Sequence, residues 1–375
     1  MTSGPGNHRD SRLVRALDPL DADETYRRLP EMNAAADLDA LVVALRRLAG
    51  NAAAVPDGTP YECRAAMRDL GLLLGSVKRH GVEPVTAVPE VEPVLLRLAA
   101  RGDVVPRDTV HHYSVWNPYG ERQRSYTGSS QEAALIDSVR LSLPRLSQAV
   151  ELAGPLTGAA LTDPEFLTAM GSFRALLASL DEAIELVIGR VNPAFFANEL
   201  RPYFDEVLVD GRLWRGGAGA GLPVPLLDLM LWAADHDQTD QDSVDYAEFW
   251  AEGVPYALPE WRRRYAELAG VPSLVARVTA ALDEAGDGPL DERLRAAATA
   301  VEQSLRALLS FRAKHLGVAR KSYQEDVRLF PVGSSGGSVE LLSSIVRLTR
   351  DNARLIRPRP AAPTANAEPE PLSRA

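Results

Sequence analysis

LLSFRAKHLGVARKSYQED, residues 308 to 326, has the spacing of apolar residues that is typical of an amphipathic helix. At about 100° per residue, four apolar positions lie within about 40° of His315 on the helical wheel. They are Val301, Leu308, Phe311 and Ala319. His315 therefore lies on the face that the pattern buries, and among these apolar residues it has no acidic or thiol neighbour.

A lone histidine on such a face has two interpretations, and residues 308 to 326 alone do not choose between them. The commoner case is a core histidine whose ring is satisfied by a backbone carbonyl. The alternative is a single imidazole ligand to haem iron, since haem supplies the other iron ligands and needs one protein ligand. A zinc site requires three or four ligands at a recognisable spacing, and the sequence contains no such set.

Helical spacing continues on both sides of this stretch and predicts an all-α fold. Beyond the helix expected over 291–326, the periodic segments are 37–51, 61–81, 90–103, 131–152, 164–190, 193–204, 223–234, a segment around Trp261, and 338–355. In EVLVDGRLWRG an Asp-Gly pair separates two short β-prone runs, which predicts a minor β-hairpin.

The order of these segments divides the chain into a small N-terminal helical domain, residues 12–110, and a larger helical domain, residues 111–355. The larger domain opens with HHYSVWNPYGERQRSYTGSSQE, an irregular stretch rich in aromatic residues and arginines. Residues 1–11 and the tail 356–375 are expected to be disordered, because the Pro-, Ala- and Glu-rich tail cannot bury a core.

Composition limits the possible functions. The net charge of −10 argues against a nucleic-acid or membrane-surface protein, which would need a basic face. No apolar run reaches the roughly 18 residues of a membrane span, and no signal sequence is visible at the N-terminus, so we expect a soluble cytoplasmic protein. Cys63 is the only cysteine and is interpreted as a small buried apolar residue.

Glycine-rich and acidic motifs give weaker signals. FPVGSSGGSVELL, residues 330–342, places a glycine turn before a helix that Ser338 is expected to cap, and such a turn offers amides and hydroxyls to a ligand. RGGAGAG, residues 215–221, lacks the βαβ context of a dinucleotide site and suits a tight turn, either against a flat ligand or before a helix. DHDQTDQD, residues 235–242, departs from the calcium-loop pattern and is interpreted as a solvated acidic loop.

Four segments in the same order resemble one family: VNPAFFANELRPYF (191–204), RGGAGAG (215–221), FRAKHLGVARKSY (311–323) and GSSGGS (333–338). They are similar to the indoleamine/tryptophan 2,3-dioxygenase superfamily of haem proteins. Within it, the chain resembles most the PrnB (monodechloroaminopyrrolnitrin synthase) family, through AAMRDLGLLLGSVKRHGVEPVTAVPEVEPVLL (65–96) and VWNPYGERQRSYTG (115–128) as well. The resemblance covers about residues 15 to 355 and implies a two-domain indoleamine dioxygenase-like helical haem fold.

The resemblance implies a role for His315 as the proximal ligand of haem b. Arg201 matches the arginine that binds the carboxylate of a tryptophan-like substrate, and a guanidinium suits a carboxylate because its planar fork binds both oxygens. Phe196 matches the first of two phenylalanines that flank the indole, whereas Ala197 stands at the second position and departs from the pattern.

Four more assignments follow from the resemblance. Ser138 matches a serine of the distal pocket. Ser335 belongs to the loop that closes over the substrate and is assigned to catalysis. Gly336 and Gly337, beside it, are assigned to cofactor binding. Tyr323 matches a tyrosine that the PrnB-like proteins keep eight residues after the histidine and is assigned to catalysis with Arg201 and Ser335. It lies about 12 Å along the helix axis from His315, so it could line the pocket but could not bind the same iron.

The implied function is haem b-dependent oxidation of L-tryptophan or a chlorinated tryptophan, with PrnB-like rearrangement and decarboxylation to an aminophenylpyrrole in secondary metabolism. The expected partners are the amino acid, dioxygen and an electron donor. Two other functions remain open: a haem dioxygenase or hydroxylase of free tryptophan or tyrosine, and a haem carrier or sensor without turnover. A carrier would not need a carboxylate-binding arginine.

Overall fold

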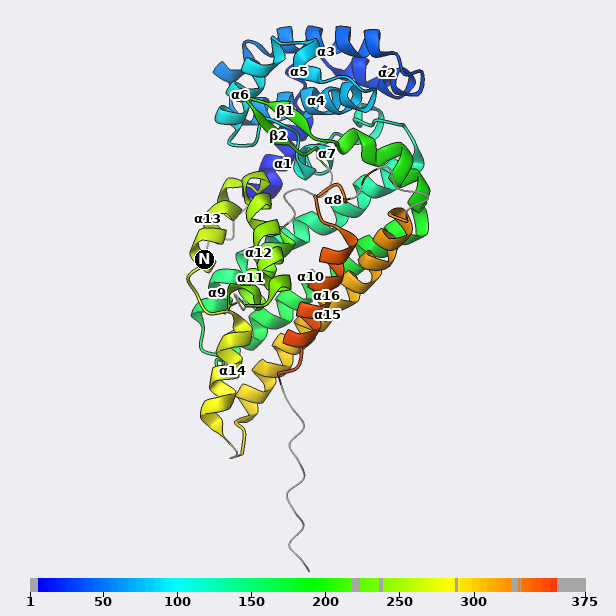
Figure 1. The fold of residues 1–375 in the computed structure, drawn as a ribbon. Helices are drawn as coiled ribbons and strands as arrows, with labels where there is room; N and C mark the ends of the chain where they lie inside the picture. Colours follow the sequence, from blue (N-terminus) through cyan, green and yellow to red (C-terminus); the bar gives the residue numbers. More distant parts are fainter. Residues whose placement is uncertain are drawn as a thin grey trace, which may run out of the picture.

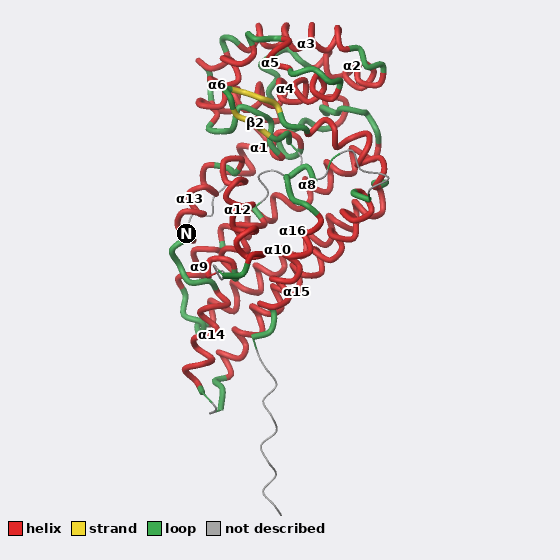
Figure 2. The backbone as a smooth tube through the Cα atoms, in the orientation of Figure 1, coloured by secondary structure: helices red, strands yellow, loops and turns green. Residues whose placement is uncertain are grey.

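The computed structural model describes residues 6–217, 223–235, 239–286, 289–324, 330 and 332–355, and Figure 2 colours them by secondary structure. Helices dominate, and the predicted all-α fold with a minor β-hairpin is confirmed. The α-helices are α1 Gly6–Ala16, α2 Asp23–Ala34, α3 Leu38–Ala52, α4 Pro60–Arg79, α5 Pro84–Ala87, α6 Val91–Gly102, α7 Val110–Tyr113, α8 Ser130–Glu151, α9 Ala153–Gly158, α10 Pro164–Arg190, α11 Val224–Leu231, α12 Gln241–Gly253, α13 Pro259–Leu268, α14 Leu274–Ala285, α15 Glu292–Ser322 and α16 Val339–Asn352. Shorter helical turns are η1 Val55–Asp57, η2 Gly120–Arg122, the π-helix η3 Phe195–Leu200, η4 Arg201–Phe204, η5 Ala233–Asp235 and η6 Val254–Tyr256.

One hydrophobic core is built around α4, near the N-terminus (Figure 1, blue to cyan). Helices α3 and α6 pack against α4, which is buried along most of its length. Thr59 and Glu62 start α4 with a capping box, in which Thr59 Oγ1 accepts from the Glu62 amide and the Glu62 carboxylate accepts from the Thr59 amide at 2.7 Å. This reciprocal cap positions the first turn of the helix that organises the core.

The β-hairpin covers one side of this core. Strands β1 Val207–Val209 and β2 Arg212–Trp214 are antiparallel, with Val209 opposite Arg212. Asp210 and Gly211 at the turn have φ of 50° and 72°, as expected for the Asp-Gly turn predicted from the sequence. The side chain of Val209 is buried in the core of α4.

The second core lies among the long helices, where α10 packs along both α8 and α15, and α16 packs along α15 (Figure 1). The apolar stripe predicted around His315 is present here. Leu308 and Val301 are fully buried, and Ala319 is nearly so. Because α8, α10 and α15 are each more than twenty residues long, they form a continuous wall beside the hollow described below.

Residues 105–128 connect the two cores and overlap the irregular stretch predicted from the sequence, residues 111–132. Apart from α7 and η2, they form neither helix nor strand, yet most of their side chains are buried. Polar contacts compensate for the missing regular hydrogen bonds. Glu132 accepts hydrogen bonds from Tyr113 Oη (2.8 Å), Ser125 Oγ (2.8 Å) and the amide of Tyr126 (2.8 Å). This stretch is thus part of the interior.

Arginines in and near this stretch form a buried ion-pair network. Arg68 donates to Asp69 through Nε and Nη2, both at 2.8 Å, and Arg124 Nε donates to the same carboxylate at 3.0 Å. Burial alone would raise the pKa of Asp69, but the two guanidinium groups lower it below its ordinary value. The network joins α4 to the connecting segment.

The N-terminal prediction needs a correction. Residues 6–11 are the first part of α1 and not a disordered segment, because the later turns of α1 pack against α4 and carry the buried Val14. The tail 356–375 lies outside the described residues. Among the helices that the structure describes, none is long and apolar enough to cross a bilayer.

Candidate functional site

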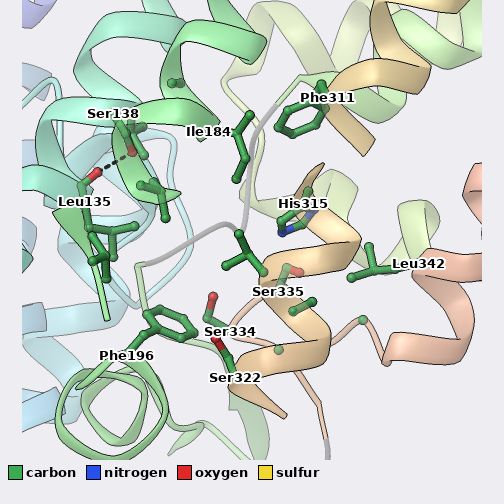
Figure 3. Close-up of a pocket in the computed structure, with 18 of the residues that line it drawn as sticks. Leu135, Ser138, Ile184, Phe196, Phe311, His315, Ser322, Ser334, Ser335 and Leu342 are labelled. Carbon is green, nitrogen blue, oxygen red and sulfur yellow. Dashed lines mark hydrogen bonds between the residues drawn. The ribbon is translucent and has the colours of Figure 1, made fainter. Parts of the chain in front are cut away.

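A mostly apolar cavity lies between α8, α10 and α15, and Figure 3 shows the residues around it. It leaves about 240 Å³ for the centres of water-sized molecules. The cavity is lined by six of the residues singled out in the sequence, namely Ser138, Phe196, His315, Tyr323, Ser335 and Gly337. Its described lining contains no aspartate, glutamate, lysine or arginine. Among the described residues, an opposite charge for a charged ligand would therefore have to come from a side chain that lies behind the lining.

His315 extends from α15 into this cavity (Figure 3). Its ring stacks on Phe311, with centroids 5.7 Å apart and planes at 11°. None of the described residues hydrogen-bonds the ring, so the backbone-carbonyl interpretation of this histidine is not supported. Burial, and the positive charge of Arg312, lower the pKa of His315, so the imidazole is neutral at pH 7 and keeps a nitrogen lone pair available as a metal ligand.

A buried ion pair fixes α15 at the turn before His315. Arg312 donates to Asp228 of α11 and to Thr349 of α16, and Asp228 is completely buried. Asp228 also accepts from Tyr246 Oη. Because three helices meet at this pair, the axial position and rotation of α15 are set within one turn of the histidine.

Across the cavity from His315 lies α8, which contributes Ser138 and Ser142 (Figure 3). Ser138 Oγ donates to the Leu135 carbonyl at 2.7 Å, and Ser142 Oγ donates to the Ser138 carbonyl at 3.1 Å. Because both hydroxyl protons are used within the helix, this wall presents oxygen lone pairs and no strong donor. Ser138 thus lines the cavity on the side opposite His315, and its role in a distal pocket stays a prediction.

One end of the cavity carries buried polar atoms without partners. Tyr323 Oη, Ser322 Oγ and the Nε and Nη1 atoms of Arg201 have no hydrogen-bond partner among the described residues. Arg201 is 5% exposed and does not line the cavity itself. Its guanidinium lies beside the Tyr323 hydroxyl and 4.2 Å from the ring centroid of Phe330.

Burial lowers the pKa of Arg201 and raises that of Tyr323, and the guanidinium partly opposes the rise. Arginine stays charged in proteins, so a positive charge that forms no ion pair with a described residue lies beside Tyr323, behind the cavity wall. An unpaired buried charge is costly, and a ligand carboxylate reaching this end would offset that cost. Ser322 and Ser334, which also line the cavity, were missed in the sequence because nothing distinguishes single serines there.

The glycine-rich loop closes another side of the cavity as an ordered turn. The Gly333 amide donates to the Gly337 carbonyl at 2.9 Å, and the Gly336 amide donates to the Gly333 carbonyl at 2.9 Å. Gly336 has φ of +89°, a conformation that residues with a side chain rarely adopt. Ser338 caps α16 as predicted, accepting from the Leu341 amide at 3.1 Å.

Arg215 holds this loop from outside. Its Nη1 donates to the Ser335 carbonyl at 3.1 Å, and its Nη2 pairs with Glu252 at 2.8 Å. A Cβ on Gly336 would lie 2.5 Å from Arg215 Cζ, so Gly336 contacts this guanidinium and does not line the cavity. The sequence pattern indicated the glycines that follow Arg215 but gave no signal for the arginine itself.

Two other motifs have structural explanations within the described residues. Gly216 and Gly217 pack against protein, since a Cβ at Gly217 would lie 2.6 Å from Asp108 Oδ2; residues 218–222 lie outside the described part. In the acidic loop, Asp240 and Asp242 pair with Arg347 at 3.1 and 2.5 Å. Residues 236–238 are not described.

The donor set around His315 suits a haem better than a bare metal ion. No group of three or more His, Cys, Asp or Glu side chains that could bind a metal occurs in the part of the chain that the structure describes. A metal held by His315 would thus need its remaining ligands from a prosthetic group, as in haem. The apolar walls and the neutral ring fit such a group.

The chain was compared with models of known protein families. The family model described as Monodechloroaminopyrrolnitrin synthase PrnB matches residues 37–362, which is most of the chain. The match includes every residue of the cavity discussed above, from Ser138 on α8 to the glycine-rich loop.

Proposed function

The chain belongs to the PrnB family, an enzyme family of oxidative tryptophan conversion, and from that premise we propose that it is a haem b-dependent oxidoreductase acting on L-tryptophan or a chlorinated tryptophan. The proposed reaction is a rearrangement of the indole with loss of the carboxylate, giving an aminophenylpyrrole. The observation that carries the haem assignment is a neutral imidazole, His315, facing an apolar cavity with no second ligand among the described residues.

The residues around the cavity have different roles in the proposed reaction. His315 holds the iron, and the haem, when bound, supplies the activation of dioxygen. Phe196 lines the cavity, and its ring offers a flat apolar contact to an indole. The apolar walls exclude water, and the serines of α8 need not move a proton, because an indole is already nucleophilic at carbon.

Arg201 binds the carboxylate of the substrate in this proposal. Its Nε and Nη1 are buried and have no hydrogen-bond partner among the described residues, and together with the adjacent Tyr323 hydroxyl they supply donors for two carboxylate oxygens. Hydrogen bonds to charged groups contribute about 1.5–3 kcal/mol, so losing the clamp should weaken substrate binding by roughly 10- to 150-fold.

The haem assignment is tested by expressing the full chain with haem supplied and recording the absorption spectrum. The expected result is a Soret band that His315→Ala abolishes or shifts and that His80→Ala, at a half-buried histidine outside the cavity, leaves unchanged. A preparation without a Soret band, or normal haem retention by His315→Ala, would overturn the proposal.

The substrate assignment is tested by titrating the haem-loaded protein with L-tryptophan, 7-chlorotryptophan, tyrosine and tryptamine. Arg201→Gln should weaken binding of the amino acids but not of tryptamine, which has the indole and amine but no carboxylate. Product masses then separate the functions: an aminophenylpyrrole supports the proposal, whereas a product gaining one or two oxygen atoms and keeping the carboxylate indicates a hydroxylase or dioxygenase. Full haem loading with no response to any of these ligands indicates a carrier or sensor.

A further inference from the structure

A second cleft lies between α1 and α8, outside the cavity of His315. It leaves about 230 Å³ for the centres of water-sized molecules. The two hollows use different faces of α8, because Ser138 and Ser142 line the cavity whereas Arg140 and Leu143 line the cleft. The proposed reaction uses none of the residues of the cleft.

The cleft is positively charged in a protein whose net charge is −10. Arg12, Arg15 and Arg140 line it, and no aspartate or glutamate does. Arg140 is already fully used, since its guanidinium donates to three backbone carbonyls, to Gln123 and to Asp137 at 3.2 Å. It supplies charge to the cleft but no hydrogen bond.

Arg12 and Arg15 are the available cations. They are three residues apart on α1 and therefore lie on the same face of the helix. Arg12 has no ion pair or hydrogen bond with a described residue. Arg15 lies over the Tyr119 ring, with Cζ 4.4 Å from the centroid, and makes one long hydrogen bond, 3.5 Å from Nη1 to the Val115 carbonyl. Two guanidinium groups with unused donors thus face the same hollow.

His111 lines the same cleft and is 1% exposed. Its ring packs between Trp116 and Trp261, with both centroid distances 5.3 Å. Neither ring nitrogen has a hydrogen-bond partner among the described residues. Each buried polar atom left in this state costs about 1–3 kcal/mol. Burial and nearby Arg64 lower the pKa of His111 to about 3, so at pH 7 the ring is neutral and has one N–H donor.

We propose that this cleft is an oxyanion-binding site, in which Arg12 and Arg15 bind a phosphate or carboxylate group and His111 donates its N–H to the same group. Guanidinium forks match the spacing of oxyanion oxygens, and a buried imidazole donor without a partner gains a hydrogen bond that the empty protein lacks. The charge of Arg140 attracts the anion, although its own N–H donors are already bonded within the protein. The proposal is independent of the haem and of the reaction in the cavity.

The site is tested by calorimetric titration of the full chain at pH 7 and low ionic strength, with inorganic phosphate and, separately, acetate as the probes. The double variant Arg12→Gln/Arg15→Gln should lower the affinity at least tenfold. The matched control is Arg293→Gln, at an exposed arginine of α15, which should leave it unchanged. Tighter binding of phosphate identifies a phosphoryl ligand, and tighter binding of acetate identifies a carboxylate ligand.

The variant His111→Phe distinguishes a role of His111 in ligand binding from a purely structural role. Phenylalanine keeps a ring between the two tryptophans but removes both orphan nitrogens. We expect equal or greater thermal stability in anion-free buffer together with at least tenfold weaker binding of the probe. No binding of either anion by the parent chain, or equal affinities in the parent, the double arginine variant and His111→Phe, would overturn the proposal and leave water as the occupant of the cleft.

Discussion

Replacing Asp228 with asparagine removes one charge from the buried pair that fixes α15. Asp228 is fully buried and accepts hydrogen bonds from Arg312, from Tyr246 Oη and from Trp232 Nε1 at 3.0 Å. The asparagine is nearly isosteric, but it leaves the Arg312 guanidinium charged, 6% exposed and without a carboxylate. Breaking one side of a buried pair costs about 3–5 kcal/mol. That is about a fifth or more of the 5–15 kcal/mol by which a typical domain is stable.

The assay is urea unfolding followed by circular dichroism, with the free energy of unfolding extrapolated to water. Asp228→Asn/Arg312→Met should recover part of the loss, because the unpaired charge is then removed. The control is Asp242→Asn, whose partner Arg347 is 44% exposed, and about 0–1 kcal/mol is expected there. A loss below about 1 kcal/mol for Asp228→Asn, or a double variant less stable than the single one by the full cost of Arg312→Met, would refute this account of the pair.

Three further predictions concern the loop, the buried histidines and a helix cap. Gly336→Ala must adopt φ near +89° and displace Arg215, so limited proteolysis of the loop at residues 333–337 should accelerate at least tenfold. His111 and His112 are neutral when folded and gain protons when unfolded below pH of about 6.5, so stability is full above that pH and lost as it falls. Between pH 6 and 5 the two should remove about 2.4 kcal/mol, measured by urea unfolding. Ser338→Ala removes the cap of α16 and should cost about 1 kcal/mol in the same assay.

Matched variants control these measurements. Gly317→Ala on α15, where a Cβ would meet nothing within 4 Å, should stabilise by about 0.5–1 kcal/mol and leave proteolysis of the loop unchanged. His111→Phe should remove about half of the pH-dependent loss. An unchanged cleavage rate in Gly336→Ala, a flat stability between pH 6 and 5, or an unaltered Ser338→Ala would each contradict the corresponding reasoning.

Local patterns explain which parts of the fold were predictable from the sequence. Helical spacing predicted the long helices, the Asp-Gly pair predicted the hairpin, and the stripe around His315 faces the interior as expected. These features depend on residues a few positions apart, whose side chains share a face. The resemblance to a family then selected Ser138, Phe196 and Tyr323, and the fold brings all three to the cavity of His315.

The features that sequence reasoning missed depend on residues far apart in the chain. Arg312 and Asp228 are 84 positions apart, and Arg215 reaches Ser335 across 120 positions. No local period in the sequence indicates such a pair. An arginine on an otherwise apolar helix face gives the same sequence pattern whether or not it pairs with a distant carboxylate. The burial of residues 105–128 was hidden for the same reason, because irregular backbone is normally a surface feature.

The buried segment 105–128 has a consequence for how the molecule unfolds. Tyr126 and Tyr113 belong to the core of α4, whereas Trp116 belongs to the core of the long helices, so a single stretch supplies side chains to both. Neither core can lose its part of the stretch without exposing apolar surface in the other. We therefore expect one cooperative transition for the two cores, with coincident midpoints for probes placed in each, and a chain cut between residues 110 and 111 should yield no stable fragment.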